Sequence, residues 1–309
     1  VNAALQLAYQ MIVKKHGYPL DSEGQRCGLE HNAFAIIGYG KVGGIELGYG
    51  SDLDVVFIHN MDEQADTDGI KPISGFEFAM RVARKFVSLM TTQTLDGRVY
   101  DVDTRLRPSG DAGLLVTSLR AFEQYQLKSA WLWEHQALVR ARSIAGDQDL
   151  RDKFEVLRCK ILTQPRDEAY VRSEVLKMRQ KMKDHLGSSK EQKKDGIFHL
   201  KQDAGGIVDI EFMAQYVVLA WSGTNADLAH YSDNVRILED AAKARCLSSD
   251  DASALIQAYL SERAESHRLA LANQSMQVSA ADWFDTREVV CKLWQRLIDP
   301  TAVFALESE

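Results

Sequence analysis

The chain has 309 residues, of which 45% are hydrophobic and 26% are charged, and its formal net charge is −7. This composition is that of a globular protein and excludes a disordered tail, a collagen-like fibre and a coiled-coil rod. Non-specific nucleic-acid binders normally carry a basic surface, and a membrane helix needs about eighteen or more consecutive apolar residues. The sequence has neither feature, so we expect no nucleic acid and no membrane among its partners.

The cysteines bear on the cellular compartment of the protein, and the first residue bears on whether the chain is a fragment. The four cysteines lie far apart and form no CxxC pair, at positions 27, 159, 246 and 291. This spacing is typical of a reducing compartment, so we expect a cytoplasmic location. The chain begins at Val1, inside a helix-like run and without an initiator methionine, so we expect a fragment of a longer protein.

Two halves differ in composition. Residues 1–146 hold most of the glycines and all of the strand-like segments, whereas residues 147–309 show helical patterns almost throughout. The sequence therefore predicts an α+β protein, with a small mixed sheet in the first domain (1–146) and an all-α helical bundle in the second (147–309).

The predicted elements follow in chain order. In the first half, apolar and β-branched runs predict strands over 34–37, 53–58, 98–106 and 114–116, and helical spacing predicts helices over 76–90 and 119–142. In the second half, helices are predicted over 150–163, 167–186, 207–221, 232–246, 249–272 and 284–298. The polar stretch 187–196 predicts a mobile loop.

A glycine-rich segment follows the first predicted strand and satisfies the dinucleotide-binding fingerprint at Gly38, Gly40 and Gly43. A Rossmann unit also needs a crossover helix of ten or more residues before its next strand. Only the short stretch from Gly44 to Ser51 precedes that strand, so the fingerprint does not predict a dinucleotide site.

Two carboxylates at the start of the second strand are more informative. Asp52 and Asp54 are two residues apart, so both side chains project from one face of the strand. Two like charges at this spacing repel each other unless a cation lies between them, and Mg²⁺ is commonly held by one or two carboxylates together with phosphates. Gly50 and Ser51 come just before, where a small residue lets backbone N–H groups approach a phosphate.

The predicted strand 98–106 supplies further charged groups. Alternation along an extended segment that reaches the following arginine places Asp101, Asp103, Arg105 and Arg107 on one face. Carboxylates beside guanidinium groups suit a metal-bound triphosphate, with arginine as a bidentate phosphate ligand. The alternative is a solvated face on which these aspartates and arginines merely form ion pairs.

Four segments, taken together, resemble the glutamine synthetase adenylyltransferase family: residues 43–54, 101–110, 133–142 and 200–212. The family belongs to the nucleotidyltransferase superfamily shared with DNA polymerase β, and this resemblance implies a polymerase β-like first domain. The family's full-length enzyme carries two related halves, one attaching AMP to a tyrosine of glutamine synthetase and the other removing it by phosphorolysis. The form GYGSDLD at 48–54 is more similar to the attaching, C-terminal half.

The resemblance also implies roles for individual residues. Asp52, Asp54 and Asp103 would hold two Mg²⁺ ions, and Asp103 would accept the proton of the target tyrosine. The family's signature requires only one acid on the strand of Asp103, so whether Asp101 is also a ligand stays open. The groups implied to contact ATP are Gly50, Ser51, Arg105, Arg107 and, from the second domain, Lys201. The implied protein substrate is glutamine synthetase, with the PII signal protein and glutamine as regulators.

Alternatives remain open at this point. The chain could be the adenylyl-removing half, a uridylyltransferase acting on PII, or a regulatory module that binds nucleotide or PII without turnover. Near Lys201, Asp209 and Glu211 could approach the nucleotide or could form a polar helix N-terminus. Arg140 and Arg142 fit interdomain ion pairs as well as ligand contacts.

Overall fold

The structure is a computed structural model that describes residues 1–302 except 30–32, 49, 96, 190 and 193–194. It divides into two compact units, Val1–Ile161 and Leu162–Glu309. The division follows helix α6 (Gln148–Leu162), whereas the sequence places the domain boundary ahead of this helix. The fold class is α+β, as the sequence predicts.

The first unit is built on a mixed sheet of five short strands: β1 (Phe34–Gly38), β2 (Leu53–His59), β3 (Val102–Asp103), β4 (Val116–Ser118) and β5 (Arg142–Gly146). The strand order is β3-β2-β1-β5, and β4 also pairs with β2. β1 is antiparallel to β2 and β5, while β3 and β4 are both parallel to β2. β3 pairs with the start of β2, and β4 pairs with its end. The loop between β3 and β4 therefore connects two short strands that lie beside the same strand, β2.

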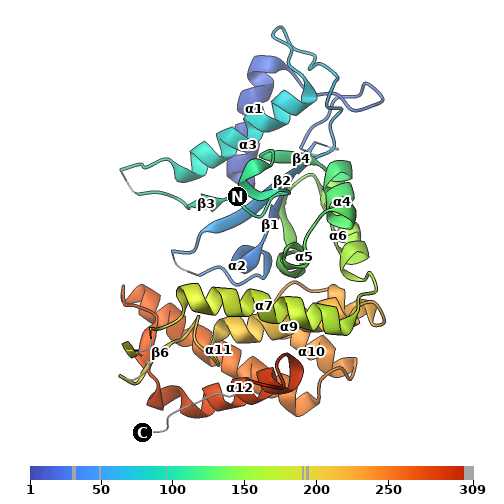
Figure 1. The fold of residues 1–309 in the computed structure, drawn as a ribbon. Helices are drawn as coiled ribbons and strands as arrows, with labels where there is room; N and C mark the ends of the chain where they lie inside the picture. Colours follow the sequence, from blue (N-terminus) through green and yellow to red (C-terminus); the bar gives the residue numbers. More distant parts are fainter. Residues whose placement is uncertain (30–32, 49, 96, 190, 193–194, 303–309) are drawn as a thin grey trace. The chain divides into compact units, whose positions relative to one another are not determined.

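One face of this sheet is covered by helices α1 (Asn2–His16) and α3 (Gly75–Thr91), which pack against each other (Figure 1). The two helices and the sheet share one apolar core. In it, Phe78 of α3 meets the ring of Tyr9 edge-on at 5.2 Å, and Phe86 meets Phe57 of β2 at 5.7 Å. Ser74 caps α3 by accepting a hydrogen bond from the backbone N–H of Glu77 at 3.2 Å.

The helix predicted over 119–142 is in fact two helices, separated by a break at residues 129–131. The chain forms α4 (Leu119–Lys128) and α5 (Leu132–Val139), and Arg142 begins strand β5 beside β1. α5 starts anew because the carboxylate of Glu134 accepts a hydrogen bond from the backbone N–H of Trp131 at 2.9 Å. Strand β5 depends on pairing with a strand that lies about a hundred residues earlier, which local pattern does not reveal.

The predicted strand over 98–106 is also too long, since only Val102 and Asp103 pair with β2. A turn follows at once, in which the backbone N–H of Arg107 donates to the carbonyl of Thr104 at 3.3 Å. Consequently the four charged side chains between residues 101 and 107 do not share the face of one strand.

The second unit is helical, as the sequence predicts, with α7 (Glu168–Leu186), α9 (Ile207–Trp221), α10 (Asn234–Lys243), α11 (Ser249–Leu271) and α12 (Phe284–Leu297). The side chains of α9 are buried along most of its length, and α9 packs against α7, α10, α11 and α12. A short antiparallel pair, β6 (Ile197–His199) and β7 (Gln277–Ser279), is an addition that the sequence did not predict. The predicted loop 187–196 lies partly outside the described residues. In the described part of the chain, no helix has both the length and the apolar character needed to cross a bilayer.

Candidate active site

Two of the predicted carboxylates lie side by side on neighbouring strands. Asp54 of β2 and Asp103 of β3 are direct partners in a parallel register. Residues opposite each other in a ladder project to the same face, and alternation along β2 places Val55 and Phe57 on the other face, in the core under α1 and α3. The sheet therefore presents both carboxylates together on the face that α1 and α3 leave uncovered.

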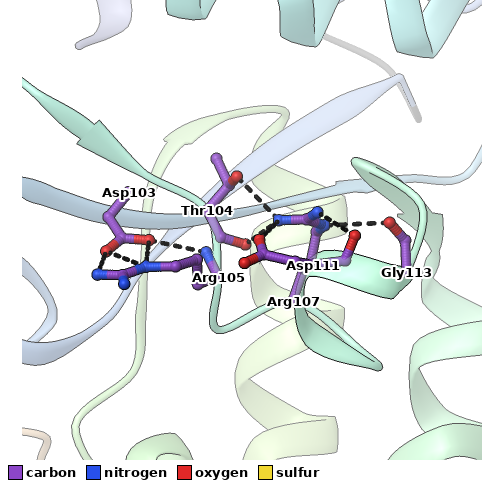
Figure 2. A network of polar contacts seen from close by, with 6 residues as sticks. All are labelled: Asp103, Thr104, Arg105, Arg107, Asp111 and Gly113. Carbon is purple, nitrogen blue, oxygen red and sulfur yellow. Dashed lines mark hydrogen bonds and ion pairs between the residues drawn. The ribbon is translucent and has the colours of Figure 1, made fainter.

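Asp103 is held by the arginine two residues later (Figure 2). Nε of Arg105 lies 2.8 and 3.0 Å from the two carboxylate oxygens of Asp103, and the backbone N–H of Arg105 donates to Oδ1 at 2.8 Å. The side-chain hydrogen bond from Arg105 is the main cause that lowers the pKa of Asp103 below its ordinary value. Asp103 is therefore a carboxylate at neutral pH, with a chain-supplied cation beside it.

Arg107, by contrast, is engaged within its own loop. Its guanidinium donates to the carbonyl of Thr104 at 2.9 Å, to that of Gly113 at 3.2 Å and to that of Asp111 at 3.2 Å (Figure 2). Its side chain is only 12% exposed. The guanidinium of Arg107 therefore stabilises the loop between Thr104 and Gly113, and its contact with a triphosphate stays a prediction.

The glycine-rich segment places a short helical turn, α2 (Gly40–Gly43), against Asp54. The backbone N–H of Tyr39 donates to the carbonyl of Asp54 at 2.8 Å. Gly40 has a φ of 54°, and a Cβ atom at this position would lie 2.8 Å from Oδ2 of Asp54. Glycine is therefore required here for two reasons, the left-handed backbone and the room that it leaves for the carboxylate.

Two arginines at or just before the start of β5, Arg140 and Arg142, hold this turn in place. Arg142 donates from Nε to the carbonyl of Gly43 at 3.2 Å and from Nη2 to that of Val42 at 3.1 Å. Arg140 forms an ion pair with Glu46 in which both side chains are less than a tenth exposed. Both arginines thus bind the glycine-rich turn of their own unit.

The segment before β2 carries the predicted phosphate-binding residues. The backbone N–H of Ser51 donates to the carbonyl of Gly48 at 3.2 Å, and Nζ of Lys41 lies 3.4 Å from Oγ of Ser51. Gly50 has a φ of 68°, and no atom lies within 4 Å of the place of a Cβ. Asp52 follows and is exposed. Sequence interpretation missed Lys41, although a basic residue inside the Gly40–Gly43 turn was a usable signal.

The donor atoms of this site suit a hard cation. Asp52, Asp54 and Asp103 offer only carboxylate oxygens, which are the ligands that Mg²⁺ prefers. Within the described ranges, no three His, Cys, Asp or Glu side chains are gathered closely enough to hold a metal ion. At Asp103 the carboxylate is instead paired with the guanidinium of Arg105.

The remaining predicted residues are placed elsewhere. Asp101 pairs with Arg98 at 2.6 Å. Lys201 is exposed in the second unit, and its contact with ATP stays a prediction. Asp209 is buried at the start of α9, where it pairs with Arg179 and accepts a hydrogen bond from the backbone N–H of Gly205 at 2.7 Å. Asp209 therefore stabilises a helix N-terminus.

Comparison with known proteins bears on this geometry. Residues 1–157 match the family model described as glutamate-ammonia ligase adenylyltransferase. The chain belongs to this family. Residues 176–290 match a second family model, GlnD PII-uridylyltransferase, so this segment is similar to part of that family.

Several curated relatives carry the same name, bifunctional glutamine synthetase adenylyltransferase/adenylyl-removing enzyme. The chain is 81% identical to the protein of Acinetobacter baylyi over 309 residues, which is the whole chain and 33% of that protein. It is 48% identical to the Pseudomonas aeruginosa protein over 301 residues, covering 95% of the chain and 30% of the relative. For the Pseudomonas putida protein the identity is 47% over 305 residues, or 96% of the chain and 31% of the relative. The chain thus spans about a third of the length of these relatives.

Proposed function

We propose that this chain transfers AMP from ATP to a tyrosine of glutamine synthetase and releases pyrophosphate. The observation that carries the proposal is the in-register pair of Asp54 and Asp103, with Gly50, Ser51 and Asp52 leading into the same strand. The family match and the names of the relatives agree with this chemistry.

Asp52, Asp54 and Asp103 would hold the metal, which we propose to be two Mg²⁺ ions. Bound there, Mg²⁺ supplies charge neutralisation of the triphosphate and activation of the attacking oxygen. Ser51 and Gly50 offer a hydroxyl and backbone N–H groups to the phosphates. Lys41 adds an ammonium group next to the Ser51 hydroxyl.

Asp103 would receive the proton from the hydroxyl of the target tyrosine. The phenol of tyrosine has a pKa of about 10, so it is a weak nucleophile at neutral pH without assistance. While Arg105 binds Asp103, the low pKa of that carboxylate makes it a poor base. Release of Arg105 toward the phosphates would free an oxygen of Asp103 for the tyrosine proton and place a guanidinium on the developing negative charge.

The decisive experiment follows label from α-labelled ATP onto purified glutamine synthetase in the presence of Mg²⁺. The wild-type chain should label the synthetase, and Asp54→Asn, which keeps the shape and removes the charge, should reduce the rate at least about a hundredfold. Asp101→Asn is the matched control, because Asp101 pairs with Arg98 and should be dispensable. Equal labelling by wild type and Asp54→Asn would contradict the proposal.

The reverse activity is a second candidate, because the relatives' name also includes adenylyl removal. Release of ADP from AMP-modified glutamine synthetase by phosphate would assign the chain to the removing half. The match of residues 176–290 makes UTP with PII protein a further substrate pair to assay. Binding of ATP or PII without any transfer would instead indicate a regulatory module.

Regulation by glutamine and PII, and a cytoplasmic location, complete the proposal. They rest on the resemblance and on the wide spacing of the four cysteines in the sequence, which form no CxxC pair. We propose that glutamine and PII act through the helical unit. A chain without residues 162–309 should then transfer AMP at a rate that neither effector changes, and a response retained after this deletion would contradict the idea.

A further inference from the structure

The first unit contains a cavity of about 390 Å³ that the proposed reaction does not use. Its walls come from the end of β2 at His59, from Glu63 and Phe76, from the loop between Pro108 and Leu114, and from Tyr125 of α4. This volume is in the range of sites that bind small molecules.

The cavity is separate from the carboxylate site. Along β2, His59 alternates with Val55 and Phe57, so its side chain projects to the face opposite that of Asp54. Five residues of extended strand between Asp54 and His59 correspond to about 17 Å at roughly 3.3 Å per residue. His59 therefore lies away from the carboxylate of Asp54 along β2 and on the other face of the sheet, and neither Asp54 nor Asp103 is among the lining residues of the cavity.

His59 is an unsatisfied polar group in the wall of the cavity. Its side chain is fully buried, and neither ring nitrogen has a hydrogen-bond partner among the described residues. Burial lowers the pKa of His59 to about 4, although the nearby Glu63 carboxylate opposes this shift. At neutral pH the ring thus has one acceptor nitrogen and one N–H donor, both unpaired, which is rare for a buried group and requires an explanation.

The other polar groups define what the cavity would accept. Glu63 brings a negative charge, and among the described lining residues there is no lysine or arginine. Phe76 and Leu114 add apolar surface. Ser109 has a φ of 63°, a strained conformation for a residue other than glycine, and it is hydrogen-bonded to Tyr125. A carboxylate and a neutral imidazole both accept hydrogen bonds from a protonated amine.

We propose that this cavity binds a small molecule that carries a protonated amine next to an apolar group. The amine would pair with Glu63, and a rotation of the buried His59 ring toward the cavity would let it donate to the acceptor nitrogen, while the apolar group packs on Phe76. The ligand would satisfy a buried ring nitrogen that the chain itself leaves unpaired.

Benzylamine, which is protonated at neutral pH, is the probe, and benzyl alcohol is its uncharged analogue. The readout is the NMR signal of the His59 ring in the full chain, assigned among the eight histidines by its loss in His59→Phe. Benzylamine should shift this signal saturably at millimolar concentration, and benzyl alcohol should bind at least tenfold more weakly. Glu63→Gln should also weaken benzylamine binding at least tenfold.

Glu23→Gln is the matched control, because Glu23 is an exposed glutamate of the same unit outside the cavity lining. Its affinity for benzylamine should equal that of the wild type. If His59→Phe fails to fold, the comparison of Glu63→Gln with Glu23→Gln still decides the matter. No saturable shift, equal binding by Glu63→Gln and wild type, or a response to Zn²⁺ alone would each overturn the proposal. The assay measures binding only, so its result is independent of AMP transfer.

Discussion

Asp103 carries its charge beside a guanidinium that comes from two residues later in the same chain. The pair is bidentate, but the side chain of Arg105 is 73% exposed, so water weakens the attraction. The pair therefore stabilises the fold little, and its main effect is on the protonation of Asp103. A contact that is readily broken would suit the proposed role of Asp103, in which Mg²⁺ takes the place of the guanidinium.

Replacing Arg105 with Gln should raise the pKa of Asp103, since the main cause that lowers it is removed. A group whose pKa is depressed by folding contributes stability above its unfolded pKa of about 3.9 and loses it as the pH falls through the folded pKa. Arg105→Gln should therefore be slightly less stable than the wild type at pH 7, and the two should become equal in strong acid. Carboxyl carbon NMR titration measures the shift, and Arg98→Gln, which removes the partner of Asp101, is the control.

Gly40 offers a second test at a single position. Gly40→Ala places a methyl group 2.8 Å from Oδ2 of Asp54, whereas Gly24→Ala, also at positive φ, meets no atom within 4 Å. Each alanine should cost about 1–2 kcal/mol through its left-handed backbone. Only Gly40→Ala should also lose AMP transfer, because only it displaces Asp54. Urea unfolding and the labelling assay separate the two effects, and equal activity of both variants would contradict this reading of Asp54.

Among the elements, those that depend on local pattern were predicted well and those that depend on distant pairing were not. β2 and α3 follow from apolar periodicity, as do the helices of the second unit. β5 was not predicted, because its partner, β1, lies far back in the sequence. The spacing of Asp52 and Asp54 was visible in the sequence, but the register that brings Asp103 beside Asp54 was not. The turn after Asp103 depends on side-chain bonds of Arg107 that no alternation rule contains.

The α2 turn depends on a buried ion pair, and its removal should be costly. Arg140→Met would leave the carboxylate of Glu46 buried without its cation, with an expected loss of about 3–5 kcal/mol. The double variant Arg140→Met, Glu46→Leu should lose less than the single variant, since no charge then remains unpaired. Guanidinium unfolding curves measure both. If the double variant were less stable than Arg140→Met, the cost of the single variant would not come from an unpaired buried charge, and this explanation would be wrong.

At the scale of the whole molecule, the position of α6 decides where the chain can be divided. Arg158 of α6 is buried and donates to the carbonyls of Leu138 and Val139 at 3.1 and 2.6 Å, and Phe154 contacts the ring of Phe122. The described residues of the main apolar core of the first unit come from positions 5 to 145 of the sequence. α6 therefore contributes none of the described core residues and packs beside this core.

Residues 1–161 should therefore unfold cooperatively as an isolated chain, whereas residues 1–146, which end at the boundary that the sequence predicts, should be partly unfolded. Circular dichroism in urea distinguishes the two.

ATP binding by 1–161 also tests Lys201, which this piece lacks. Affinity equal to that of the full chain would remove Lys201 from the nucleotide site, and cooperative folding of 1–146 would contradict the role given to α6.

The bonds from Arg142 to Val42 and Gly43 join residues that are 100 and 99 positions apart. They form only after a loop of this length has closed, and such closure is opposed by chain entropy. The β1–β2 hairpin needs a much shorter closure and can form earlier. During synthesis, the carboxylates of β2 would thus leave the ribosome well before the turn beside them is fastened. The candidate active site is therefore completed late. A nascent chain that ends before β5 would contain the acidic residues of the site but lack the bonds from Arg142 that hold the neighbouring turn.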